Sequence, residues 1–130
     1  MDIDNDSLMS AARAASEKAY CVYSHFPVGA ALVTLDGRVF TGCNIENASY
    51  GLTICAERVA VFSAIAAGAS KIASIALTCP KGDPRKPRTL MPCGACRQVL
   101  AEFAVADLVV IIDGIGAIPF RELLPQPFEL

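Results

Sequence analysis

The chain has 130 residues, of which 54% are hydrophobic, and a formal net charge of −2. This length predicts one compact domain, residues 1–130, that buries a core without needing disulfides. No apolar run approaches the roughly 18 residues that span a bilayer, and the acidic balance gives no general attraction to nucleic acid, so neither a membrane nor a nucleic acid is an expected partner.

The first six residues are acidic and lack the basic start and apolar stretch of a signal peptide. The sequence therefore predicts a cytoplasmic location, where cysteines are usually reduced. The six cysteines are interpreted as metal ligands and core thiols rather than as three disulfides. Cys21, Cys43 and Cys79 have no second cysteine at ligand spacing, which makes them the expected core thiols.

Hydrophobic periodicity divides the chain into helices and strands. In chain order, the predicted elements are a helix that begins near Asp6 or Ser7, strands at 28–35 and 38–43 joined by a turn at 36–37, a loop at 44–53, a helix at 54–67, a strand at 72–79, a surface loop at 80–88, a helix from about Cys93, a strand at 108–112, a short strand at 115–119 and a helical turn at 120–124. A hairpin followed by alternating helices and strands predicts an α/β fold, with helices packed on both sides of the sheet.

The predicted helix at 54–67 is unusually apolar. Between Val59 and Ala67 its only polar residue is Ser63. A helix that is apolar on all sides is buried on all sides, and one sheet in so small a domain cannot cover every face of it. This helix and the high apolar fraction favour an oligomer.

Two short motifs carry the chemistry. Cys55-Ala56-Glu57 is followed by Pro92-Cys93-Gly94-Ala95-Cys96, and Cys93 lies 36 residues after Glu57. Three thiolates can hold a zinc ion and leave its fourth position open for water, which is the pattern of a catalytic zinc site. The predicted positions at helix starts lower thiol pKa values. A glutamate two residues after the first ligand can move the protons of that water, and the combination is the signature of zinc-dependent deaminases.

The spacing of the first motif sets a geometric condition. Two residues on a regular helix point about 200° apart, so Cys55 must lie at or before the first turn if it and Glu57 are to reach one pocket. The small Ala56 lets a substrate approach the backbone. Three thiolates on Zn²⁺ leave a net negative charge, which Arg58 could offset by donating to the sulfurs. A solvated position on the helix explains Arg58 equally well.

Three other polar features admit more than one interpretation. Asn44 and Glu46 share a face of an extended segment and suit sugar hydroxyls, but asparagine also favours turns, and the spacing alone does not choose. His25 is interpreted as a structural or loop residue because Glu57 already fills the role of base. The basic loop 80–88 has no aromatic residue for base stacking and is interpreted as a solvated surface loop.

Over nearly its whole length, the chain resembles the small homotetrameric zinc-dependent cytidine deaminases. The segments that carry the resemblance are 23–31, 42–48, 53–58, 92–98 and 122–125. One departure is Val22, which stands where the family commonly has proline. The resemblance implies a three-layer α/β/α fold with a mixed, mostly five-stranded sheet, one zinc ion per subunit, and a homotetramer whose pockets are shared between subunits.

The resemblance also implies roles for individual residues. The implied zinc ligands are Cys55, Cys93 and Cys96, with Glu57 as proton shuttle and Arg58 as partner of the zinc thiolates. The implied substrate contacts are Phe26 on the pyrimidine, Asn44 and Glu46 on the ribose hydroxyls, the backbone of Ala56 on the base, and Tyr50 and Phe128 from neighbouring subunits.

The implied reaction is hydrolytic deamination of cytidine and 2′-deoxycytidine to uridine and 2′-deoxyuridine with release of ammonia, a step of pyrimidine salvage. A deaminase acting on an aminonucleoside antibiotic, or on cytosine in nucleic acid, would use the same zinc chemistry. A module that uses zinc only for stability is the alternative from another class.

Overall fold

The protein is built on one mixed, five-stranded sheet. The structure, a computed structural model, describes residues 3–130. Residues 1 and 2, the start of the predicted domain, lie outside the described residues. In order across the sheet, the strands are β2 (Val39–Cys43), β1 (Gly29–Thr34), β3 (Ile72–Thr78), β4 (Ala104–Ile112) and β5 (Gly116–Pro119). Strands β3 and β4 are parallel, and the other neighbours are antiparallel.

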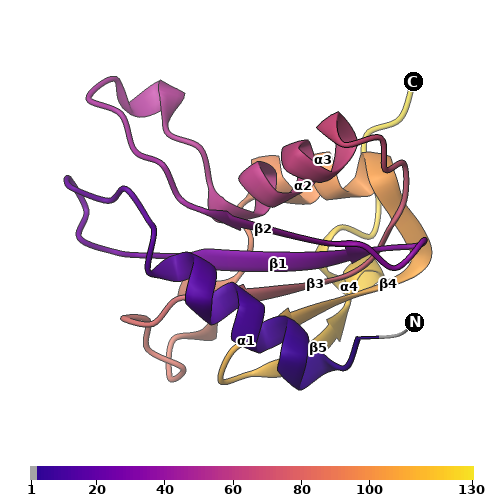
Figure 1. Ribbon diagram of the computed structural model, residues 1–130, viewed down its shortest axis with the longest axis horizontal. Helices are drawn as coiled ribbons and strands as arrows, with labels where there is room; N and C mark the ends of the chain where they lie inside the picture. The colour runs from indigo at the N-terminus through magenta and orange to yellow at the C-terminus, as the bar shows by residue number, and fades with distance from the viewer. Residues whose placement is uncertain (1–2) are drawn as a thin grey trace.

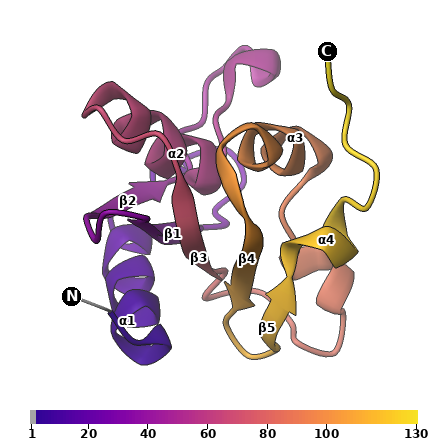
Figure 2. The same cartoon turned by 90° about the vertical axis from the view of Figure 1, so that its right-hand side faces the viewer.

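Helices cover both faces of this sheet (Figures 1 and 2). Helix α1 (Asn5–Ser16) packs on β1 and β3 from one side, whereas α2 (Ala56–Ala66) and α3 (Gly94–Phe103) lie on the other side. The shorter helices are α4 (Phe120–Leu123) and the 3₁₀ turns η1 (Tyr50–Leu52) and η2 (Pro87–Leu90). The predicted three-layer α/β/α fold with a mixed five-stranded sheet is confirmed.

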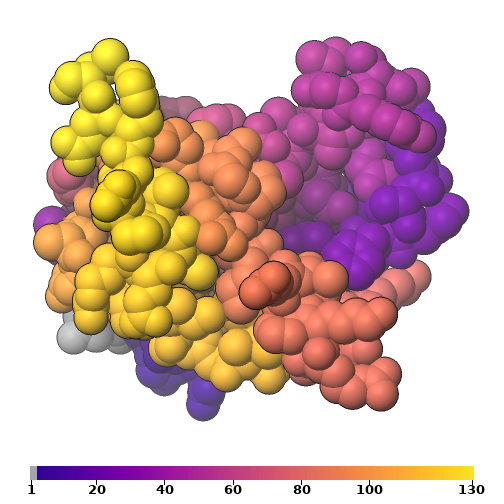
Figure 3. Space-filling model, turned by 180° about the vertical axis from the view of Figure 1, so that it is seen from behind, coloured from indigo at the N-terminus to yellow at the C-terminus, as the bar shows by residue number. Residues whose placement is uncertain are grey.

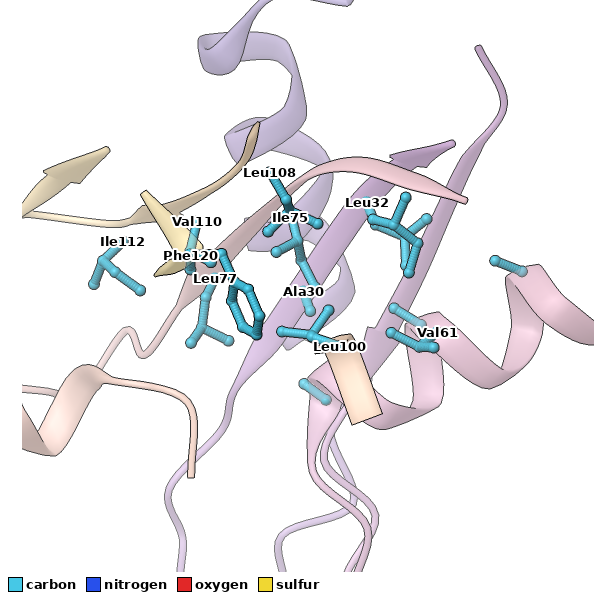
Figure 4. Packing of buried hydrophobic residues seen from close by; sticks show 14 of the residues in the cluster. Ala30, Leu32, Val61, Ile75, Leu77, Leu100, Leu108, Val110, Ile112 and Phe120 are labelled. Atoms are coloured by element: carbon cyan, nitrogen blue, oxygen red, sulfur yellow. The ribbon is translucent and has the colours of Figure 1, made fainter. Parts of the chain in front are cut away.

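Side chains on the central strands alternate between two hydrophobic cores, as the period of a strand requires. On β1, Ala30 and Leu32 join the core beneath α2 and α3, while Ala31 and Val33 face α1. Figure 4 shows the larger core, in which side chains of β1, β3 and β4 meet Val61 of α2 and Leu100 of α3. The packed core between the sheet and the helices therefore fixes the positions of α2 and α3 relative to the sheet.

Two glycines allow the helices to approach the sheet closely. A Cβ atom on Gly29 would lie 2.0 Å from the carbonyl oxygen of Ala12 in α1. On the opposite face, a Cβ atom on Gly42 would lie 2.4 Å from the carbonyl oxygen of Ala56, in the first turn of α2. Gly42 therefore fixes how near the start of α2 sits to β2.

Three element boundaries differ from the sequence predictions. Helix α1 is capped by Asp4, whose carboxylate accepts from the Ser7 amide at 2.7 Å, and not by Asp6 or Ser7. Helix α2 begins at Ala56, two residues later than predicted. Strand β4 begins at Ala104 and not at Leu108. The local cap at Asp4 extends α1, and pairing with β3 extends β4. The type of each element was predicted correctly, and the other predicted helix and strand boundaries lie within one residue of those observed.

Helix α2 is not buried on all sides within one chain. Phe62 is 48% exposed, and Ser63, Ala66 and Ala67 are also exposed. As expected from its composition, one sheet leaves an apolar face of this helix uncovered. Among residues 3–130, no helix has the length and apolar character needed to cross a membrane.

Candidate active site and metal centre

The starts of α2 and α3 bring two cysteines together. Cys55 and Cys93 occupy the N-cap positions of α2 and α3, with extended backbone angles (φ −72°, ψ 154° and φ −67°, ψ 169°). Neither side chain makes a capping hydrogen bond, so both sulfurs are free to point away from their helices. Cys55 thus precedes the first turn, which meets the geometric condition for sharing a pocket with Glu57.

Cys96, in the first turn of α3, completes a cluster of three thiols whose sulfur atoms all lie within 4.8 Å of one another. The Cys55 and Cys93 sulfurs are 3.8 Å apart, and those of Cys93 and Cys96 are 3.5 Å apart. Sulfurs at two corners of a tetrahedron with zinc–sulfur bonds of about 2.3 Å would lie about 3.8 Å apart, so the spacing fits a zinc ion. A disulfide would need about 2.05 Å, and all three thiols are free.

The surroundings of the cluster favour negative charge. The Nη2 atom of Arg58 donates to the Cys55 sulfur at 3.4 Å. Hydrogen bonds from Cys96, Arg58 and Cys93 lower the pKa of Cys55 to about 5, against the opposing effect of burial. The hydrogen bond to Cys55, together with burial, raises the pKa of Cys96. Metal ligands must be deprotonated, so binding a cation would displace the proton that Cys96 retains.

Among the described residues that line the cavity beside the thiols, Glu57 is the one with a carboxyl group. It is only 5% exposed, and its side chain lines this cavity together with Cys55 and Cys93. Burial, and to a smaller extent the charge of Cys55, raises the pKa of Glu57 to about 7. A carboxyl group with a pKa near neutrality suits general acid–base chemistry.

The cavity has a volume of about 200 Å³. Figure 3 shows the molecule hollowed between the purple and magenta segments, which come before α2, and the orange segment that leads into α3. Its lining residues are Phe26, Val28, Asn44, Thr53, Cys55, Ala56, Glu57, Leu77, Cys79, Thr89, Met91 and Cys93. One cavity therefore holds two of the predicted zinc ligands, Cys55 and Cys93, together with the acid Glu57. The same cavity is lined by the residues expected to contact the base, Phe26 and Ala56.

Asn44 and Glu46 are already engaged with the backbone of segment 20–28. Asn44 is buried; its Oδ1 accepts from the Val28 amide and its Nδ2 donates to the Phe26 carbonyl, both at 2.9 Å. Glu46 accepts from the amides of Tyr23 and Ser24 and from the Ser24 hydroxyl. The Ser24 hydroxyl, more than any other group, lowers the pKa of Glu46.

These contacts give Asn44 the structural role that its turn preference suggested, while it also lines the cavity. Glu46 lines a second hollow of about 320 Å³, with Tyr23, Ser24, Tyr50 and Thr53. Thr53 lines both hollows. A ligand that reaches from the thiols past Thr53 would therefore extend toward Glu46.

Tyr50 and Phe128 do not line the cavity of their own chain. Tyr50 is 78% exposed in η1, where its ring meets that of Tyr23 edge-on at 6.3 Å. Phe128 is 71% exposed near the carboxyl terminus, held to Gln98 by backbone hydrogen bonds. Figure 1 shows the magenta turn of η1 and the carboxyl terminus at opposite ends of the molecule. Tyr50 can meet a ligand of its own chain only in the hollow of Glu46, whereas Phe128 lines neither hollow and could contribute only to the site of another copy of the chain.

The sequence analysis missed six residues of the cavity, namely Val28, Thr53, Leu77, Cys79, Thr89 and Met91, and three of them show why. Cys79 was assigned to the core, and Thr89 and Met91 follow a segment interpreted as a solvated loop. All three line the cavity, because η2 turns the chain back against the site before α3 begins. Burial raises the pKa of Cys79 to about 11, so it remains a neutral thiol. No local pattern marks these positions, since only the fold brings them to the site.

On an α/β/α fold, three thiols at two helix starts beside a buried carboxyl group define a zinc-dependent hydrolytic deaminase. The family described as "Cytidine and deoxycytidylate deaminase zinc-binding region" matches residues 2–112. The chain belongs to this family, and zinc is its cofactor.

Similar proteins cover nearly the whole chain. A cytidine deaminase of Halalkalibacterium halodurans is 47% identical over 97% of this chain and 95% of its own length. One from Mycobacterium tuberculosis is 46% identical over 99% of this chain and 92% of its own. The crystal structure of cytidine deaminase from Burkholderia pseudomallei superposes with a TM-score of 0.87 at 48% identity, covering 97% of this chain and 100% of that one. The resemblance to cytidine deaminases is confirmed.

Proposed function

We propose that this chain hydrolyses cytidine and 2′-deoxycytidine to uridine and 2′-deoxyuridine, with release of ammonia, as a step of pyrimidine salvage. The observation that carries the proposal is the placement of Glu57 in one cavity with the thiols Cys55 and Cys93. The names of its relatives, cytidine deaminases at 46–47% identity, support cytidine as the substrate.

Cys55, Cys93 and Cys96 would hold the zinc ion, and Arg58 would neutralise part of the thiolate charge. When bound, zinc supplies a water that is acidic enough to lose a proton near neutral pH. Glu57 does not belong to the thiol cluster, which leaves its carboxyl group free to act on the substrate.

Glu57 performs both proton transfers in this proposal. It takes one proton from the attacking water and delivers it to ring N3, which makes C4 more electrophilic. After the oxygen has added at C4, Glu57 passes the second proton of the water to the exocyclic amino group, which leaves as ammonia. A pKa raised to about 7 lets the same carboxyl group accept and release a proton at neutral pH.

The remaining lining residues would orient the nucleoside. The ring of Phe26 would pack on the pyrimidine, and the backbone of Ala56 would contact the base. Asn44 keeps one free amide hydrogen and one free lone pair beyond its two backbone bonds, which a ribose hydroxyl could use. Glu46, ionised by its hydrogen bonds, would accept from another hydroxyl.

An ultraviolet assay of the zinc-loaded protein against cytidine, 2′-deoxycytidine, adenosine and single-stranded DNA tests the proposal. We expect turnover of the first two only, and Glu57→Gln should keep its zinc and lose nearly all turnover. Glu17→Gln is the matched control, because Glu17 is exposed at the end of α1 on the other side of the sheet. Deamination of DNA, or a Glu57→Gln variant as active as the parent, would contradict the proposal.

We also propose that the chain, acting as a single domain over residues 1–130, forms a homotetramer that shares pockets between subunits. The exposed side chains of Phe62, Tyr50 and Phe128 support this assembly, because a second copy could cover the open face of α2 and bring aromatic rings to the cavity. Sedimentation of a stable monomer at micromolar concentration would overturn it. The cytoplasmic location stays a prediction.

A further inference from the structure

The segment between β3 and α3 borders the cavity at two points. At its far end, Thr89 and Met91 line the cavity, and Leu90 is buried in the core between them at 3% exposure. At its near end, the Lys81 ammonium group donates to the carbonyl oxygen of His25 at 3.2 Å. In Figure 3 the salmon segment 80–91 and the purple segment before β1 meet at the edge of the hollow.

The acceptor of this hydrogen bond is part of a constrained turn. His25 has a left-handed backbone conformation, with φ 57°, and it is the one non-glycine residue among residues 3–130 with positive φ. Histidine adopts this conformation at a cost, so surrounding contacts must hold it. One is the hydrogen bond from the His25 amide to the Cys21 carbonyl at 2.8 Å, and Lys81 holds the carbonyl side of the same residue.

The residue that follows His25 is Phe26, whose ring lines the cavity. The Phe26 amide donates to the Ser24 hydroxyl, and its carbonyl accepts from Asn44. Ser24 and Asn44 belong to the turn itself and to the strand end beside it, whereas Lys81 reaches it from a segment 56 residues away. Lys81 therefore contacts the turn before Phe26 from the same segment of the chain that supplies Thr89 and Met91 to the cavity.

We propose that Lys81 is a positioning residue for substrate binding: its hydrogen bond to the His25 carbonyl holds Phe26 at the angle from which its ring packs on the pyrimidine. This inference rests on the proposed function. Lys81 acts through Phe26 and not on the reacting atoms, so its loss should weaken the binding of substrate and leave the chemical step unchanged.

The test compares three variants of the full-length, zinc-loaded protein. Lys81→Met should raise KM for cytidine by about 3- to 10-fold, the range expected for loss of a partly exposed charged hydrogen bond, with kcat unchanged. Lys81→Arg should restore a KM near that of the parent, since a guanidinium can also donate to the carbonyl. Lys86→Met is the control, because it removes the same charge from the same exposed segment. Within residues 3–130 the Lys86 side chain makes no hydrogen bond, so this variant should leave both KM and kcat unchanged.

A second measurement does not depend on activity. Amide hydrogen exchange of Phe26 and Val28 should be faster in Lys81→Met than in the parent and in Lys86→Met, because the turn loses the contact that holds the carbonyl of His25. Equal KM values in Lys81→Met and Lys86→Met, or an unchanged exchange rate, would overturn the positioning role. If the parent itself does not deaminate cytidine, the proposed function fails, whereas the exchange comparison still decides whether Lys81 holds the turn.

Discussion

Replacing Gly42 with alanine should disturb the site from outside the cavity, because Gly42 does not line it. The added Cβ would lie 2.4 Å from the carbonyl oxygen of Ala56 and 2.5 Å from the amide nitrogen of Ala60. Since real Cβ atoms stay beyond 3.0 Å, the Ala56 carbonyl must recede by about 0.6 Å. Both neighbours are backbone atoms of α2, so the helix has to move as a unit and carries Cys55 and Glu57 with it.

Overpacking of this kind costs about 1–3 kcal/mol of unfolding free energy. A displacement of that size at the site should lower kcat by roughly 10-fold, since a 1 Å misplacement can cost about 100-fold. Urea denaturation at fixed protein concentration and initial rates with cytidine measure the two effects. Gly51→Ala is the control, because a Cβ there meets nothing within 4 Å. A Gly42→Ala variant as stable and as active as Gly51→Ala would refute the reasoning that Gly42 sets the distance between α2 and β2.

Three further predictions concern the metal, the charge network and the assembly. Cys96→Ser should reduce bound zinc from one ion per chain to nearly none, as measured by elemental analysis; full retention of zinc would remove Cys96 from the ligand set. Asp113 has a lowered pKa because Arg13 and then Thr78 donate to it, so its stabilisation is complete above the unfolded pKa of about 3.9 and is lost as the pH falls through the lower folded value. Asp113→Asn should therefore lower the unfolding free energy by about 1 kcal/mol at pH 7, with a difference from the parent that shrinks below pH 4; a constant difference down to pH 2 would contradict this account. Phe62→Asp should shift the sedimentation of the proposed tetramer toward smaller species, since it places a charge on the apolar face of α2; sedimentation equal to that of the parent would contradict a role of this face in assembly.

The sequence identified most of the fold because its elements carry strong local patterns. Apolar runs marked β1 and β3, and the cysteine motifs marked the starts of α2 and α3. The first four residues of β4, Ala104 to Asp107, were missed because they are half-buried or exposed and Asp107 interrupts the apolar run before Leu108. They are strand residues because β3 lies beside them, with Ile72 paired to Ala104, and that pairing is not visible in a local window.

The same distinction holds for the site. The spacing of Cys55, Cys93 and Cys96 predicted a metal cluster that the structure assembles. By contrast, nothing near Thr89 or Met91 in the sequence resembles a binding motif, and their place in the cavity depends on η2 and on the burial of Leu90. The metal ligands can be recognised in the sequence from their residue types and spacing. The residues that only line the cavity can be identified only from the folded structure.

The cluster of three thiols also makes the protein sensitive to the order in which it meets metal and oxidant. The sulfurs of Cys93 and Cys96 are 3.5 Å apart at the start of a helix, an arrangement from which dithiols are readily oxidised. A newly folded chain that encounters oxygen or peroxide before zinc would close a disulfide across the ligand set and be unable to load. Purification under reducing conditions with zinc present throughout should therefore give a higher fraction of competent enzyme than zinc added at the end.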